Sequence, residues 1–239
     1  MSDKRPQERA TKGRARKSSP LTPYIVGTVV VLAVVAGLIL IGVAARGGNG
    51  GGTVGGPVVV PTARPASVAQ NGRVFGDPAA SVTVAEYLDF QCPICRRAGL
   101  QVLPAIETQF IETGVAKLEI RPIAILGDES VQAAAAAECA NEQGEFWAYY
   151  DILYANQGAE RSGAFSDARL KQFAEALGLD TGAFNACLDS GKYVDQVEQD
   201  TNDARAAGVK GTPTILVNGA KVETSVDAIA AAIQQAAGG

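Results

Sequence analysis

The sequence predicts an α/β domain that follows one transmembrane helix. The prediction rests on an uncharged apolar run at residues 24–45, a Gly- and Pro-rich stretch after it, and alternating strand and helix patterns from about residue 73. The chain has 239 residues, a formal net charge of −4 and no His. Without imidazole, Ser-His-Asp and Cys-His hydrolases, His-Glu-x-x-His metalloproteases and zinc sites with His ligands are excluded.

The first 45 residues are predicted to anchor the chain in the cell membrane as a single-pass protein. Residues 1–23 hold seven basic and two acidic residues, which is typical of a disordered basic head. Residues 24–45 carry no charge, and a helix of that length spans about 33 Å, enough to cross a bilayer core. The positive-inside rule then predicts a cytoplasmic N-terminus and an extracytoplasmic domain. The alternatives are a cleavable signal peptide, whose apolar region is usually shorter, and a buried core helix.

Residues 46–72 are predicted to form a linker, rich in Gly at first and then stiffened by three Pro residues. The remainder, residues 73–239, has the size of one domain. From residue 47 onward, 23 acidic residues stand against 13 basic ones, and the basic head lies on the other side of the membrane. We therefore expect contact with membrane lipid through the apolar helix and no binding of nucleic acid.

The domain shows the order strand, helix, strand, helical block, hairpin, helix. The strand patterns lie at residues 81–90, 115–121, 211–217 and 221–223, and the helical patterns at 96–113, at intervals through 130–210, and at 225–236. Between the last two strands, Asn218-Gly219 is typical of a type I′ hairpin turn.

All four cysteines lie in the predicted external domain, where disulfides form and persist. Cys92-Pro93-Ile94-Cys95 lies between the first strand and the first helix. Cys92 is therefore expected at a helix N-terminus, where backbone N–H groups and the helix dipole favour a thiolate. Cys95, one turn later and facing inward, is expected to be the resolving thiol. The alternatives are half of a zinc site, for which the chain has no second such Cys pair, and a purely structural disulfide.

Three segments resemble the thioredoxin superfamily and, within it, the DsbA-like thiol:disulfide oxidoreductases. They are Tyr87-Leu88-Asp89-Phe90-Gln91-Cys92-Pro93-Ile94-Cys95, Gln143-Gly144-Glu145-Phe146-Trp147 and Gly211-Thr212-Pro213-Thr214, and the resemblance covers about residue 74 to the C-terminus. It implies a thioredoxin fold with an inserted helical subdomain at about residues 128–209, and a cis Pro213 that faces the Cys pair. No cofactor and no metal are implied, because the chemistry belongs to the thiols.

The resemblance also implies roles for single residues. Cys92 would be the exposed nucleophile and Cys95 the buried resolving thiol, while Glu86 would be a buried acid that moves protons for Cys95. The backbone of Thr212 would pair with an incoming peptide strand. The alternatives are a partly exposed strand carboxylate at Glu86 and an ordinary β-branched strand residue at Thr212. Ile94 stands where the best-known DsbA pattern has a His, so we expect a less strongly oxidising disulfide.

Cys139 and Cys187 both fall in the predicted helical insertion. If Cys92 and Cys95 form the redox pair that the resemblance implies, these two remain to pair with each other as a structural disulfide. The alternative is two free buried thiols.

The function expected from these observations is a membrane-anchored oxidoreductase that introduces disulfides into exported proteins with reduced cysteines. The resemblance implies that a quinone-linked membrane oxidase, of the DsbB or vitamin K epoxide reductase type, recharges it. Two alternatives stay open. One is a disulfide reductase or isomerase, for example in cytochrome c maturation, and the other is a non-enzymatic peptide-binding or chaperone module on the same fold.

Overall fold

The structure is a computed structural model that describes residues 56–238. The predicted basic head and transmembrane helix, residues 1–45, lie outside the described residues. Among the residues that are described, none of the helices has both the length and the apolar character needed to cross a membrane.

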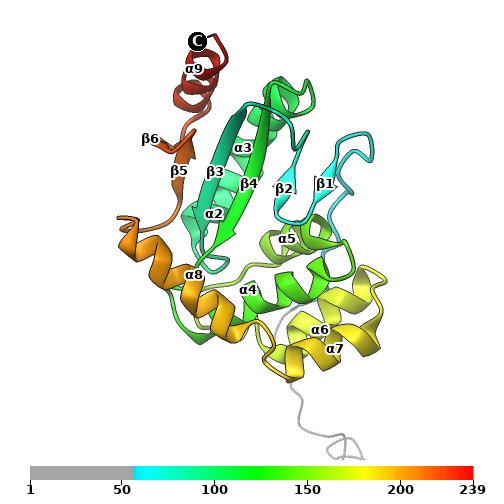
Figure 1. Cartoon of the computed structure of the whole chain (residues 1–239). Coiled ribbons are helices and arrows are strands. Elements are labelled where there is room, and N and C mark those ends of the chain that lie inside the picture. Colours follow the sequence, from blue (N-terminus) through cyan, green and yellow to red (C-terminus); the bar gives the residue numbers. More distant parts are fainter. Residues whose placement is uncertain (1–55, 239) are drawn as a thin grey trace, which may run out of the picture. The chain divides into compact units, whose positions relative to one another are not determined.

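A six-stranded mixed sheet forms the centre of the described part, in the order β1-β2-β4-β3-β5-β6 (Figure 1). Its strands are β1 (Gln70–Asn71), β2 (Val74–Phe75), β3 (Val82–Leu88), β4 (Ala116–Pro122), β5 (Thr214–Val217) and β6 (Ala220–Val222). The central strand β3 runs parallel to β4 and antiparallel to β5. The β5–β6 turn has positive φ at both Asn218 and Gly219, as a type I′ turn requires.

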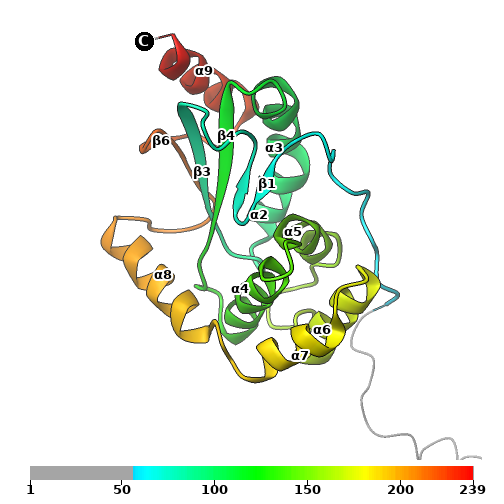
Figure 2. The ribbon, with the colours of Figure 1, turned by 45° about the vertical axis from the view of Figure 1, so that its right-hand side comes forward.

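One face of the sheet is apolar and covered by helices. The register places Val84 of β3 beside Leu118 and Val217, and all three are buried. One layer of helices covers this face. It consists of α9 (Val226–Ala237) and, beside it, a continuous helical segment made of α2 (Pro93–Arg97), η1 (Ala98–Val102), α3 (Leu103–Ile106) and η2 (Glu107–Ile111). Figures 1 and 2 show α2 starting at the end of the sheet where β3 finishes.

The helical segment after β3 differs from the uniform α-helix that its sequence predicts, because η1 and η2 are π-helical. Pro104 explains the first departure. It has no N–H to donate to the carbonyl one turn back, so the regular ladder is interrupted at this point. The wider η1 turn contains Gly99, which lies one turn after Cys95.

Five helices lie between β4 and β5, at the place where the resemblance implies a helical insertion. They are α4 (Asp128–Asn141), α5 (Phe146–Ala155), α6 (Asp167–Ala176), α7 (Thr181–Asp189) and α8 (Val194–Ala206). Figures 1 and 2 show them gathered at the end of the sheet where α2 begins. A run of five buried alanines, residues 133–137, lets α4 pack closely against its neighbours α5, α7 and α8.

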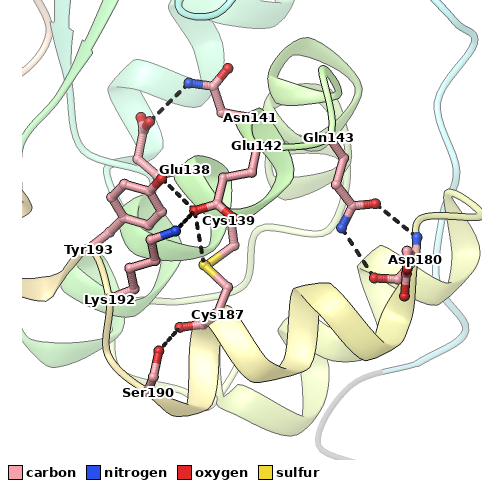
Figure 3. Close-up of a disulfide and its surroundings, with 10 residues drawn as sticks. All are labelled: Glu138, Cys139, Asn141, Glu142, Gln143, Asp180, Cys187, Ser190, Lys192 and Tyr193. Carbon is pink, nitrogen blue, oxygen red and sulfur yellow. Dashed lines mark hydrogen bonds and ion pairs between the residues drawn. A yellow bond between two sulfur atoms is a disulfide. The ribbon is translucent and has the colours of Figure 1, made fainter.

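Cys139 of α4 and Cys187 of α7 form a disulfide, with the two sulfur atoms 2.05 Å apart (Figure 3). This is the pairing that the resemblance implies. Further contacts in Figure 3 start just after α4. The carboxylate of Glu142 accepts hydrogen bonds from Lys192 and from the Tyr193 hydroxyl, which lie between α7 and α8. The Gln143 side chain accepts from the N–H of Asp180, just before α7, at 2.9 Å. The insertion is therefore cross-linked at the C-terminal end of α4.

Removal of this disulfide is expected to destabilise the protein without removing its thiol chemistry. Cys139 and Cys187 are 48 residues apart, so loop closure predicts a loss of up to about 4 kcal/mol in the free energy of unfolding. Urea unfolding of the double variant Cys139→Ala/Cys187→Ala checks this value against the unreduced wild type. An unchanged urea midpoint would contradict the prediction, and a lost reactivity of Cys92 would show that the insertion does more than support the site.

Residues 57–69, within the described part of the predicted linker 46–72, lie along the domain as an extended strap. The Val59 N–H and C=O exchange hydrogen bonds with the Asn156 side chain, at 2.8 and 2.7 Å. The Arg64 guanidinium donates to Asp151 at 2.8 and 2.9 Å and to Glu107 at 2.8 Å, and lies 4.6 Å from the Trp147 ring. The Gly and Pro content alone indicated a free linker, because an extended Pro-rich chain has the same composition whether it is docked or not.

Candidate active site

Cys92 lies at the N-cap of α2, immediately after the turn that follows β3. Its backbone is extended, and its Sγ accepts a hydrogen bond from the Cys95 N–H at 3.4 Å. Pro93 occupies the first helical position, where no N–H is needed. The expectation of an exposed Cys92 is wrong: only 6% of its surface is exposed, because the backbone of Thr212 lies against its sulfur. Cys95 is fully buried, and both are free thiols in this structure. The sequence prediction of a Cys pair at a helix start therefore describes the observed geometry.

The two thiols differ strongly in their acidity. Hydrogen bonding from the Cys95 thiol is the main cause that lowers the pKa of Cys92 to about 6, with help from backbone N–H groups and against the effect of burial. Burial, above all, raises the pKa of Cys95, and the Cys92 sulfur and the charge of Glu86 raise it further. At pH 7 Cys92 would be about nine-tenths thiolate, while Cys95 stays a thiol. The site thus combines one acidic thiol with one thiol that keeps its proton.

The Thr212–Pro213 peptide bond is cis, the geometry that the resemblance implies, and it lies against the Cys pair. The Cys92 thiol donates to the backbone oxygen of Thr212, at 3.5 Å, across 120 residues of sequence. The predicted strand at 211–217 begins only at Thr214, since Pro213 has no N–H to contribute to a strand ladder. Thr212 therefore precedes β5 and is not an ordinary strand residue.

Glu86 lies inside the domain beneath the two thiols. Its side chain is fully buried, and neither carboxylate oxygen has a hydrogen-bond partner within the described part of the chain. Burial, followed by the negative charges of Cys92 and Glu107, raises the pKa of Glu86 to about 8. The alternative of a partly exposed strand carboxylate is thus contradicted. In this position the carboxylic acid can give a proton to a Cys95 thiolate, and the carboxylate can take one from the Cys95 thiol.

Two polar side chains that the sequence analysis did not single out hold the loop around Cys92. Gln157 donates to the backbone oxygens of Phe90 and Cys92, at 2.6 and 3.1 Å. The Asp89 carboxylate accepts from the backbone N–H groups of Gln91, Ile125 and Leu126, at 2.8, 2.8 and 3.1 Å. An Asp two residues before Gln91 is an Asx-turn signal in the sequence. Gln157 comes from the insertion, and no local pattern relates it to Cys92.

Among the residues that the structure describes, no cluster of three or more His, Cys, Asp or Glu side chains is placed to hold a metal ion. The chemistry available at this site is that of two thiols with unlike pKa values, a buried acid, and a backbone carbonyl at the cis proline. Such a set can form and break one disulfide bond.

Comparisons with known proteins agree with this geometry. A family model described as thioredoxin matches residues 68–235. The "Probable disulfide bond formation protein D" of Bacillus cereus is 31% identical over 165 residues, which is 67% of this chain and 76% of that protein. The structure of oxidised BdbD from Bacillus subtilis superposes with a TM-score of 0.66 at 27% identity, over 71% of this chain and 94% of BdbD.

A third relative is a larger protein. The Na(+)/H(+) antiporter NhaA 3 of Salinispora tropica is 35% identical over 168 residues, which is 69% of this chain and 24% of the antiporter. The chain therefore spans only about a quarter of this relative. Since the family model covers most of the chain and the relatives that match along most of their length are disulfide bond formation proteins, this chain belongs to the thioredoxin superfamily and is one of its DsbA-like members.

Proposed function

We propose that the protein is a membrane-anchored thiol:disulfide oxidoreductase that introduces disulfides into exported proteins. The observation that supports this most directly is the contrast within one motif: Cys92 has a pKa lowered to about 6, and Cys95 is a buried thiol next to the acid Glu86. A disulfide that only stabilises the fold does not require two cysteines with such different pKa values. The names of the Bacillus relatives, which concern disulfide bond formation, support the same reaction.

The reaction begins with the Cys92–Cys95 disulfide. A thiolate of the substrate attacks the Cys92 sulfur, the Cys92–Cys95 bond breaks, and Cys95 leaves as a thiolate that takes a proton from Glu86. A second thiolate of the same substrate then attacks the substrate sulfur that is bound to Cys92 in the mixed disulfide, and Cys92 leaves as a thiolate. The helix N-terminus stabilises this leaving group. The substrate has lost two electrons, which the reduced Cys pair now holds.

Substrate binding would use the strand edge beside the cis proline. The backbone of Thr212 lies next to the Cys92 sulfur and outside strand β5, so an extended peptide could pair with it while its own Cys reaches Cys92. Ile94, half of whose surface is exposed next to Cys92, offers an apolar contact to such a peptide. A peptide bound in this way is recognised mainly by its backbone, which suits a range of exported substrates.

The anchor and the recharging partner belong to the same proposal. The uncharged run at residues 24–45 and the basic head before it support a single membrane span with the Cys pair outside. Because each cycle leaves two electrons on the Cys pair, a second oxidant is required. A quinone-linked membrane oxidase of the DsbB or vitamin K epoxide reductase type would meet this need beside the bilayer.

The reduction potential of the Cys92/Cys95 couple tests the direction of electron flow. A pKa of about 6 in place of 9 stabilises the reduced form by about 1.4 kcal/mol at pH 7, which makes the couple about 30 mV more oxidising. We expect a potential above about −200 mV when the full chain in detergent is equilibrated with glutathione. A value near the −270 mV or so of thioredoxin would contradict the oxidase and favour a reductase, which the Ile94 position also allows.

A refolding assay separates the enzyme from a peptide-binding module. With a reduced, unfolded substrate protein, the oxidised chain should produce native disulfides in stoichiometric amount. If the chain instead raised the yield of refolding equally well with both Cys92 and Cys95 replaced by Ser, the protein would act as a chaperone and the proposed function would be wrong.

A further inference from the structure

Two tyrosine hydroxyls inside the domain have no partner, and both lie near Glu86. The hydroxyls of Tyr150 and Tyr154 and both carboxylate oxygens of Glu86 are buried and form no hydrogen bond within the described part of the chain. A buried polar group without a partner costs about 1–3 kcal/mol, and native proteins leave few of them. Internal water is the usual partner of buried polar groups that find none within the protein.

The two tyrosines lie against the helix that begins at Cys92. They are one turn apart on α5, with their rings perpendicular and the ring centres 4.9 Å apart. The Tyr150 hydroxyl approaches the helix so closely that a Cβ atom placed on Gly99 would be 2.7 Å from it. Gly99 lies one turn after Cys95 on the same helical segment. The absence of a side chain at Gly99 therefore lets the Tyr150 hydroxyl approach the helical segment one turn after the resolving thiol.

The groups around Glu86 define the possible routes for a proton. Within the sheet its neighbours on β4 and β5 are Ile120 and Ile215, and α9 presents buried Ile229 and Ile233, so these sides offer no polar path. The charged or titratable groups that face it come from the remaining elements: Cys92 and Cys95 of α2, Glu107 of η2, and Tyr150 and Tyr154 of α5.

On its far side, Tyr150 adjoins the ion pairs under the strap. The Arg64 guanidinium lies 5.5 Å from the centre of the Tyr150 ring and binds both Glu107 and Asp151. The side chains of these three charged residues are 10–16% exposed. Arg64 and Asp151 also line a surface cavity of 300 Å³ between the strap and α5. Solvent thus reaches the cluster of Arg64, Glu107 and Asp151, called the strap cluster below.

We propose that the hydroxyls of Tyr150 and Tyr154, together with internal water, form a proton path that connects Glu86 to the strap cluster. The path rests on the proposed oxidoreductase function, and it assigns Tyr150 and Tyr154 as positioning residues. It opens to solvent on the strap side of the domain, so the bound substrate does not block it.

The proton balance is simple. When Cys95 leaves the disulfide as a thiolate, it takes the proton of Glu86, and Glu86 becomes a carboxylate. Each water and each phenol along the path then gives one proton toward Glu86 and receives one from the side of the strap cluster, so that only solvent loses a proton. Recharging of the Cys pair returns the proton by the same path. No tyrosine ionises, which agrees with the effect of burial in raising the pKa of both phenols.

The test removes only the hydroxyl oxygens, by Tyr150→Phe, Tyr154→Phe and the double variant in the full chain. The matched control is Tyr149→Phe on the same helix, whose buried hydroxyl donates instead to the Leu170 backbone oxygen at 2.8 Å. A single turnover of the oxidised protein with a dithiol peptide is stopped by acid at successive times and read by mass spectrometry, from pH 5 to about 10.

We expect the double variant to lose at least about tenfold in the rate of Cys92–Cys95 cleavage at about pH 9, where most of Glu86 is a carboxylate that has to receive a proton through the path before it can protonate Cys95. The limb of its pH profile that reports the titration of Glu86 should move up by about one pH unit. Without the phenols, the internal water donates less well to the Glu86 carboxylate, and this raises its pKa. Tyr149→Phe should leave the limb in place. An unmoved limb in the double variant, or an equal movement in the control, would overturn the proton path.

A second readout keeps this result separate from the proposed function. Difference infrared spectroscopy follows the carboxylic C=O stretch of Glu86 with pH, and it requires no thiol exchange. If the wild type exchanges no thiols, the proposed function fails. The titration of Glu86 should still move in the double variant, and a titration that does not move overturns the path by itself.

Discussion

Replacement of Cys95 by Ser is expected to stop the reaction at the mixed disulfide, whereas replacement of Cys92 by Ser should remove exchange altogether. Cys92 is the thiol whose pKa is lowered to about 6 and which retains some exposed surface, so it alone can be attacked and can leave. Loss of a nucleophile typically costs several powers of ten in rate, and we expect at least about a thousandfold here.

The two variants have opposite signatures when the reduced protein is mixed with a peptide whose single Cys carries a thionitrobenzoate leaving group, which the Cys92 thiolate can displace to form a mixed disulfide. The products are separated without reductant. Cys95→Ser should accumulate a covalent complex through Cys92, because no second thiol can release the peptide. Cys92→Ser should give no complex, since the remaining Cys95 is buried and its pKa is raised. The variant Cys139→Ala/Cys187→Ala is the control, as it lacks the other two cysteines but keeps the reactive pair.

Two results would contradict this assignment. If Cys92→Ser still formed the complex, Cys95 would be the attacking thiol despite its burial. If Cys95→Ser released the peptide from the mixed disulfide at the wild-type rate, Cys92 would act without a resolving thiol, and the contrast between the two pKa values would have no role in the reaction.

The parts of the site that are local in sequence could be predicted from it. The turn from β3 into α2 is specified by a strand pattern, a Pro at the first helical position and the Cys spacing, and these determine the environment of Cys92. The hairpin at Asn218-Gly219 is local in the same sense. Each of these features depends on residues within one or two turns of each other, so their pattern survives in the linear sequence.

The parts that could not be predicted depend on contacts across the fold. Composition predicts a linker where the strap lies, because it carries no information on the partners of Arg64, which are 43 and 87 residues away in sequence. Gln157 and the orphan phenols of α5 meet the Cys pair only because the insertion folds back over the end of the sheet. The i, i+4 spacing of Tyr150 and Tyr154 was visible, but it indicates only a shared helix face.

Replacement of Glu86 by Leu is expected to stabilise the protein at neutral pH while it slows thiol exchange. A buried carboxyl with a pKa raised from 4.5 to about 8 keeps its proton in the native state when the unfolded chain has already released it. The stabilising effect of the raised pKa is thus complete below pH 4.5, and the free energy of unfolding falls as the pH rises to about 8. The total loss is about 5 kcal/mol.

Glu86→Leu should remove this slope, and at pH 7 it should raise the free energy of unfolding by about 3 kcal/mol. The oxidised form is the better one to measure, because in the reduced form the lowered pKa of Cys92 adds stability from pH 6 to 9, with the opposite sign. The part of the pH dependence that comes from Glu86 should be somewhat smaller in the oxidised wild type than in the reduced one. In the reduced form, the Cys92 thiolate adds to the raised pKa of Glu86.

Urea unfolding between pH 4 and about 9 measures the slope, and single turnovers with a dithiol peptide measure the rate, which should fall at least about tenfold. Glu119→Gln is the matched control: Glu119 lies on the neighbouring strand with its carboxylate paired to Arg121 at a partly exposed site, so its loss should leave the exchange rate unchanged. A variant Glu86→Leu that is more stable and equally fast would mean that the buried acid serves no step of the reaction. A more stable but slower variant would show that the domain tolerates an unpartnered carboxyl because the resolving thiol needs a proton there.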